Sequence, residues 1–263
     1  MDISNEIKYV AYCSYLGTKS FLTYRAQAAL WVVVNFLPPV FAFITIGIIY
    51  NVSAGIAGWT YYQMLLLSAT TILLNSLINT VVSPYPVVRK MLTGGIDIDL
   101  TKPISRMSAV MASAQFPLTS VLSGVASAML VFAYAIPHLQ ISAINIAGAV
   151  FLFFLAMVAL IPFGMMITAL SYYLLKSANL ARRILNFSSS VGGYPMSVYG
   201  YFGQLIFTLL IPFGLAYYYP AEVLLGKIGI MQYLILSCIA LAIALASYLL
   251  FERVMREYAS GGG

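Results

Sequence analysis

Charged side chains are scarce in this chain of 263 residues: Asp, Glu, Lys and Arg make up 8% of it, whereas 62% is hydrophobic. The mean hydropathy of +0.95 is too high for a soluble domain, which needs a polar surface. The composition therefore indicates an integral membrane protein with roughly six spans of about 20 residues. No length remains for a sizeable soluble domain, so an ATPase domain would have to come from another chain.

Cysteine and histidine are also rare, with only Cys13, Cys238 and His138 present. Two cysteines and one histidine do not make a zinc-binding pattern, and we expect both cysteines to be free thiols. His138 falls in a short turn between apolar runs, where we expect a loop residue and not a catalyst. The sequence therefore predicts neither a metal site nor a catalytic site.

The long apolar runs predict an all-α integral membrane protein that forms a single transmembrane domain over residues 1–263. Bases and aromatic residues alternate at helical spacing in residues 1–25, which predicts a helix lying along the membrane surface. A polar loop, 84–106, separates the second and third spans, and a mixed segment, 176–199, follows the fourth. The expected spans cover about 27–50, 60–83, 107–136, 143–175, 200–218 and 228–251.

The positive charges fall on one side of the predicted membrane. With a cytoplasmic N-terminus, every Lys and Arg except Lys227 lies on the cytoplasmic side. This distribution predicts a multi-pass protein of the cell membrane with both termini in the cytoplasm. The net charge of +6 then reflects topology and contact with anionic lipid heads, and we expect no nucleic-acid partner.

No Asp, Glu, Lys, Arg or His falls in the middle of an expected span. Ionisable residues that are kept inside a membrane usually mark a proton or ion relay. Their absence argues against a proton-coupled antiporter, a voltage sensor and an intramembrane hydrolase, which needs a base, a nucleophile or metal ligands.

Neutral polar residues recur at multiples of four along two of the expected spans, so each set lies on one slowly winding face. The members are Gln63, Thr71, Asn75 and Asn79 on the second span and Gln115, Thr119, Ser123 and Ser127 on the third. One interpretation is helix packing through hydrogen bonds and small residues, as in Ser120-x-x-x-Gly124. The other is the wall of a translocation route for an amphipathic or lipid-like substrate.

The loop 84–106 has the features of a small docking element. Pro84 and Pro86 end the second span, and the residues up to Met91 can form a short amphipathic helix that Gly94-Gly95 terminates. The loop is too short for a catalytic domain but can form a compact knob for a partner. A solvated loop with nothing docked is the alternative.

Several short motifs, in this order and spacing, resemble the ABC transporter type-2 permease family, in particular its compact six-span prokaryotic members. The resemblance covers about residues 55–230. It is carried by Gly58-Trp59-Thr60, Gly95-Ile96-Asp97, Leu100 to Ile104, Tyr194-Pro195, Ile211-Pro212-Phe213 and Tyr219-Pro220-Ala221.

The resemblance implies an N-terminal surface helix, six spans and a cytoplasmic coupling helix in the loop after the second span. It also implies a second permease, identical or related, and two separate ABC ATPase subunits that bind ATP and magnesium. This chain lacks the G-x-x-x-x-G-K-[ST] motif, and no cofactor is expected on it. The implied ATPase-docking residues are Pro86, Val87, Val88, Arg89, Lys90, Met91, Gly95, Asp97, Asp99, Leu100 and Pro103.

The resulting first hypothesis is a permease subunit, not itself an enzyme, whose transport is coupled to ATP hydrolysis by a partner; the family implies export. A membrane scaffold or assembly protein without transport is the second hypothesis. The third is an ATP-independent carrier or channel, which the lack of charge within the spans disfavours.

Overall fold

The computed structural model describes residues 3–53, 55–115 and 117–259. Within these ranges the chain is almost entirely helical and contains no strand, which confirms the all-α prediction. Residues 1–2 of the expected surface helix and residue 116 of the expected third span lie outside the described ranges.

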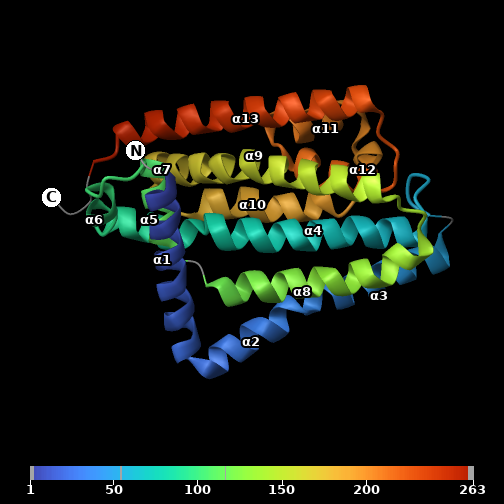
Figure 1. Ribbon diagram of the computed structural model, residues 1–263, viewed down its shortest axis with the longest axis horizontal. Coiled ribbons are helices and arrows are strands. Elements are labelled where there is room, and N and C mark those ends of the chain that lie inside the picture. The colour runs from blue at the N-terminus through green and yellow to red at the C-terminus, as the bar shows by residue number, and fades with distance from the viewer. Residues whose placement is uncertain (1–2, 54, 116, 260–263) are drawn as a thin grey trace.

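Five helical segments are long and apolar enough to cross a membrane, and one bent helix pair provides a sixth candidate. Figure 1 shows the long helices α4, α8, α9 and α13 running side by side along the longest axis of the molecule. The five segments are α2 and α3 (Arg25–Asn35 and Leu37–Val52), α4 with α5 (Tyr61–Val82 and Pro84–Leu92), α8 (Leu118–Ala135) with a short 3-10 turn, α9 (Ala143–Leu175) and α13 (Ile230–Arg256).

Helix α1 (Ile3–Thr23) crosses one end of this bundle at a steep angle to the long helices (Figure 1). It packs against α7 (Arg106–Ala114). Gly17 permits the close approach, because a Cβ at this position would overlap the backbone carbonyl of Gln115. A glycine contact therefore sets how closely α1 lies against the junction of α7 and α8.

The range 107–136, expected as one span, is divided between α7 and α8. Helix α7 ends at Ala114, Gln115 adopts a left-handed conformation with φ of 47°, and Pro117 precedes the first residue of α8. Proline has no N–H and excludes the preceding residue from helical geometry, so a continuous helix cannot pass this point easily. Of the two helices, α8 belongs to a candidate span, whereas α7 packs against α1 and against the helices of the loop 84–106.

The range 200–218, also expected as one span, lies in a sharply bent helix pair. Its two arms, Met196–Leu210 and Gly214–Leu224, meet at 91°. The break contains Pro212, and π-helical turns flank it on both sides. The first arm comprises the 3-10 turn η2 (Met196–Tyr199), α11 (Gly200–Leu205) and η3 (Ile206–Leu210), and the second comprises η4 (Gly214–Tyr218) and α12 (Tyr219–Leu224).

Helix α10 (Asn179–Gly192) occupies part of the segment 176–199, which the sequence analysis treated as a connection. It packs along α4 and α9 (Figure 1). Its apolar residues Ala181 and Leu185 are buried, whereas Arg182 and Asn186 are exposed. The helix is too polar to be found by hydropathy, and its 14 residues are fewer than the roughly 20 that a full span needs.

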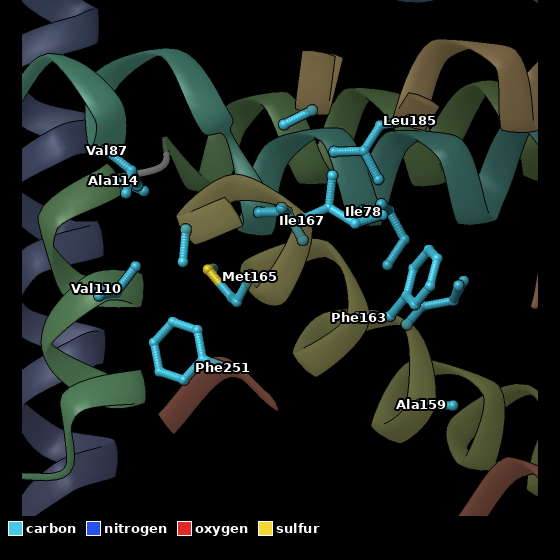
Figure 2. Packing of buried hydrophobic residues seen from close by; sticks show 14 of the residues in the cluster. Ile78, Val87, Val110, Ala114, Ala159, Phe163, Met165, Ile167, Leu185 and Phe251 are labelled. Carbon is cyan, nitrogen blue, oxygen red and sulfur yellow. The ribbon is translucent and has the colours of Figure 1, made fainter. Parts of the chain in front are cut away.

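A buried apolar cluster joins helices that are far apart in the sequence (Figure 2). The side chains labelled there come from α4, α5, α7, α9, α10 and α13, and include Ile78, Val87, Val110, Ala114, Phe163, Ile167, Leu185 and Phe251. The short helix α5 is thus attached to the same core as the long helices.

We predict that Gly124→Ala destabilises the contact between α4 and α8. A Cβ at position 124 would overlap Oγ and Cβ of Ser76 on the facing helix. The helices would have to move apart, at a cost of about 1–3 kcal/mol, and the unfolding temperature of the purified protein should fall.

Gly47→Ala is the matched control, because a Cβ at Gly47 meets nothing within 4 Å. The second change Ser76→Gly should restore the stability that Gly124→Ala loses. Equal unfolding temperatures for Gly124→Ala and Gly47→Ala would contradict the assignment.

Candidate functional site

A cavity of about 770 Å³ lies between α2, α4 and α8, and we call it the polar cavity. Its volume falls within the range of about 300–1,000 Å³ that is usual for ligand pockets. Among the described residues that line it, none is ionisable. Its neutral polar lining consists of Gln27, Asn35, Thr71, Asn75, Ser76, Asn79, Thr80, Ser83, Ser120 and Ser127.

Three amides dominate the chemistry of the polar cavity. Asn79 Nδ2 donates a hydrogen bond to Asn75 Oδ1 at 2.5 Å, and Asn35 Nδ2 donates to Ser123 Oγ at 2.8 Å. A side-chain amide has two donors and an acceptor with two lone pairs, so each has capacity left over. The Nδ2 of Asn75 and the Oδ1 atoms of Asn35 and Asn79 have no protein partner among the described residues. These atoms are available to a ligand.

A second cavity, of about 330 Å³, lies between α3, α4 and α10, and we call it the apolar cavity. Its walls include Phe41, Ile46, Ile49 and Met64. It shares Pro38, Thr71 and Ile72 with the polar cavity. The two cavities therefore adjoin along α4, with the polar one extending toward Ser83 and the apolar one toward the start of the helix.

Two threonines attach α4 to its irregular neighbours. Thr71 Oγ1 lies 2.9 Å from the carbonyl oxygens of Leu67 and Gly192, the latter at the end of α10. Thr70 Oγ1 lies 2.8 Å from Leu67 O and 2.9 Å from Tyr217 O in the bent helix pair. The hydroxyl of Thr71 thus ties α4 to the end of α10, and the hydroxyl of Thr70 ties α4 to the bent helix pair.

The predicted polar faces divide between the polar cavity and structural positions. Thr71, Asn75, Asn79 and Ser127 line the cavity, and Ser123 contacts its wall through Asn35. The other three predicted residues do not line the cavity. Gln63 forms a capping box with Thr60 at the start of α4, Gln115 ends α7, and Thr119 Oγ1 is buried without a hydrogen-bond partner among the described residues.

Sequence reasoning missed the contribution of α2 to the polar cavity. Gln27, Trp31 and Asn35 line it from the first candidate span. Their spacing of four is the same signal that singled out α4 and α8, so the pattern was present in the sequence.

The loop 84–106 turns much of its predicted docking surface inward. Val87, Val88 and Met91 of α5 are 0%, 2% and 0% exposed and belong to the apolar core. The apolar face of this amphipathic helix is covered by the bundle itself. These three side chains position the loop and do not form its outer surface.

Asp99 joins the loop to α1. The carboxylate accepts hydrogen bonds from Tyr9 Oη at 2.8 Å and Lys102 Nζ at 3.0 Å, and Lys90 Nζ lies 3.5 Å away. Burial raises the pKa of Asp99, but the hydrogen bonds from Lys102 and Tyr9 and the nearby positive charges outweigh it, so the pKa lies below its usual value. Hydrogen bonds to Tyr9 and Asp99 raise the pKa of Lys102 to about 12.

Glu6 makes a second junction between α1 and the loop. Its carboxylate accepts hydrogen bonds from Ser105 N at 3.1 Å, Ser105 Oγ at 2.9 Å and Ser108 Oγ at 2.6 Å. Ser105 is the N-cap of α7, where a negative charge is favourable. The hydrogen bonds from Ser108 and Ser105 lower the pKa of Glu6.

The end of α13 holds the loop from the other side. Tyr258 Oη donates to Asp97 Oδ1 at 3.0 Å and to the Met91 carbonyl at 3.2 Å. Arg106 forms an ion pair with Glu252 at 2.8 Å. Both acids of the segment 96–100 thus have partners inside the protein: Asp97 is bonded by Tyr258 near the C-terminus, and Asp99 is bonded by Tyr9 of α1.

A family model described as ABC-2 family transporter protein matches residues 36–262. The chain belongs to this family. No curated protein and no solved structure matches the chain. ABC-2 permeases are membrane subunits for transport, generally not catalytic themselves, that normally work with ABC ATPase subunits. Family and helices together indicate a multi-pass membrane protein.

In this ABC-2 protein the outer surface of the loop is formed by the face of α5 that points away from the core, together with exposed residues of the following segment 97–103. We call this surface the loop tip and define it as Tyr85, Arg89, Leu92, Ile98 and Pro103. Ile98 is 70% exposed and Tyr85 is 63% exposed. Of the predicted docking residues, Arg89 and Pro103 belong to the tip. The exposed apolar residues Tyr85, Leu92 and Ile98 were not predicted, although positions 85, 89 and 92 share one helical face.

We predict that acid loosens α1 from the loop. Glu6 and Asp99 have folded pKa values below the usual values of about 4.3 and 3.9. Their stabilising contribution is therefore complete above those values and is lost as pH falls through the lower folded values. Cys13, buried on α1, should then react faster with a disulfide reagent that is active in acid, such as 4,4′-dithiodipyridine.

The Cys238→Ser background isolates the signal of Cys13, and Asp99→Asn should produce the faster reaction already at neutral pH. An Asp99→Asn rate at neutral pH equal to that of the parent would contradict the role given to this carboxylate.

Proposed function

We propose that this protein is the membrane permease of an ABC exporter and that separate ATPase subunits bind its loop tip. The observation that carries the proposal is an exposed apolar surface with one base, on a loop fixed from three sides. Tyr85 and Ile98 offer apolar area at the end of the bundle, and Arg89 adds charge. Exposed apolar residues rimmed by polar ones are typical of protein contact sites.

The attachment of α5 supports transmission of force from such a partner. Val87, Val88 and Met91 fix α5 in the core, so a displacement of the tip carries the whole helix with it. Only Ser83 separates α5 from the preceding helix α4, and α4 forms a wall of both cavities. Rocking of α5 and α4 between two packed arrangements would open the cavities alternately.

The position of the termini supports a cytoplasmic location of the tip. Figure 1 shows the start of α1 and the end of α13 at the same end of the bundle as α5 and α6 (Asp97–Leu100). The expected excess of Lys and Arg on the cytoplasmic side assigns this end to the cytoplasm. The ATPase subunits on that side would bind ATP and magnesium, and this chain would bind neither.

The exposed face of α10 supports pairing with a second permease, identical or related. Arg182 and Asn186 are exposed and lie four residues apart, on one face of α10. Contact of this face with lipid chains would be costly. A second subunit would cover it without that cost.

We predict that Ile98→Asp disrupts binding of the ATPase. The variant should express and fold normally, because the side chain is 70% exposed, but it replaces an apolar residue of the tip with a charge. Loss of a central interface residue typically costs about 2 kcal/mol or more, which corresponds to roughly 30-fold weaker binding. The measurement is co-purification of the ABC ATPase that accompanies the full-length chain in mild detergent, together with its ATP hydrolysis.

Ile230→Asp is the matched control: Ile230 is 82% exposed and lies at the opposite end of the bundle, in the first turn of α13. An Asp is favourable at a helix N-terminus. Retention of the ATPase by Ile98→Asp at the level of Ile230→Asp would refute docking at the tip. A complex whose ATP hydrolysis does not depend on the permease would instead favour the scaffold hypothesis.

A further inference from the structure

We propose that the two cavities along α4 bind one amphiphile, with an uncharged hydrogen-bonding head in the polar cavity and an alkyl chain in the apolar cavity. The proposal rests on the proposed function, since it names the class of substrate that such a permease would carry. It assigns a direction to the bound molecule, with its head toward Ser83 and its chain toward the start of α4.

The lining of the polar cavity selects against charge. Its described wall offers amides and hydroxyls and no ionisable group. A charged head would leave water without meeting an opposite charge, and burial of an unpaired charge is strongly unfavourable. A head with several hydroxyl groups can instead exchange water for the free amide atoms of Asn35, Asn75 and Asn79. A sugar or another polyol has this chemistry.

The lining of the apolar cavity suits a hydrocarbon chain. Most of its wall is aliphatic or aromatic, including Phe41, Ile46, Ile49 and Met64, and the hydroxyl of Thr71 is occupied by Leu67 O and Gly192 O. The remaining hydroxyls of the wall belong to Thr45, Ser68, Ser190 and Tyr194. Burial of each CH₂ group in such surroundings is favourable. Pro38, Thr71 and Ile72 line both cavities, so the two meet at these side chains, and a single molecule that occupies both would pass over them.

The test uses the full-length protein in lipid nanodiscs and three photoreactive probes. Each carries the same dodecyl chain with a diazirine at its end, and the heads are maltoside, sulfate and trimethylammonium. The maltoside probe should label peptides of α3 and α4 that line the apolar cavity, and unlabelled dodecyl maltoside should displace it. The charged probes should need about tenfold higher concentrations for half-maximal labelling, because their heads lack partners.

Asn75→Leu and Asn79→Leu should each weaken maltoside labelling by about tenfold, since they remove amide partners of the head. Gln204→Leu is the matched control, because Gln204 lines a separate cavity formed with α13. Asn79→Asp provides a gain of function: it places a negative charge in the polar cavity and should shift the preference toward the trimethylammonium probe.

Equal labelling by all three heads would overturn the proposal and indicate a site that takes up any alkyl chain. Unchanged selectivity in Asn79→Asp, with the variant folded, would overturn it as well. The measurement needs no ATPase, so its outcome is separate from that of the tip variants. If the complex with the ATPase forms normally but all three probes label equally whatever their head group, this inference is refuted and the proposed function stands.

Discussion

The burial of α5 against the bundle is the contact on which the arrangement of this permease depends. Val87, Val88 and Met91 enter the core that α4, α7, α9, α10 and α13 share, and they attach the loop 84–106 to the bundle. Tyr9, Glu6 and Tyr258 then hold the loop from both sides through hydrogen bonds. A loop fixed in this way can transmit a displacement, whereas a solvated loop would absorb it.

The interior of the bundle is governed by a second constraint, the need to satisfy polar backbone groups where water is scarce. The bent helix pair and the end of α10 leave carbonyls without regular helical partners. Thr70 and Thr71 on α4 supply hydroxyls to Tyr217 and Gly192 at these points. The irregular segments are therefore tied to a straight helix, and the apolar cavity lies beside that attachment.

Prolines illustrate how far local sequence rules reach in this protein. Pro117 and Pro212 coincide with breaks, and Pro38 lies in the first turn of α3 next to the junction with α2. Pro162, in contrast, lies inside the uninterrupted helix α9. The missing N–H is the same in each case, so proline alone does not decide where a helix ends, and α9 continues past Pro162 where it packs extensively against α13.

Composition and the long continuous apolar runs determined that this is an all-α membrane protein, because an apolar run of about 20 residues satisfies its backbone in lipid by forming a helix. Short motifs indicated the family, and the spacing of Thr71, Asn75 and Asn79 indicated a polar face, since helical periodicity is a local property. Tertiary structure decided which side of the loop faces outward: Val88 is buried and Ile98 is exposed, although both are aliphatic. It also packed the polar helix α10 against α4 and α9 and gave Asp97 and Asp99 partners more than 80 residues away in sequence. Such choices depend on which surfaces meet once the helices pack, and no local pattern contains that information.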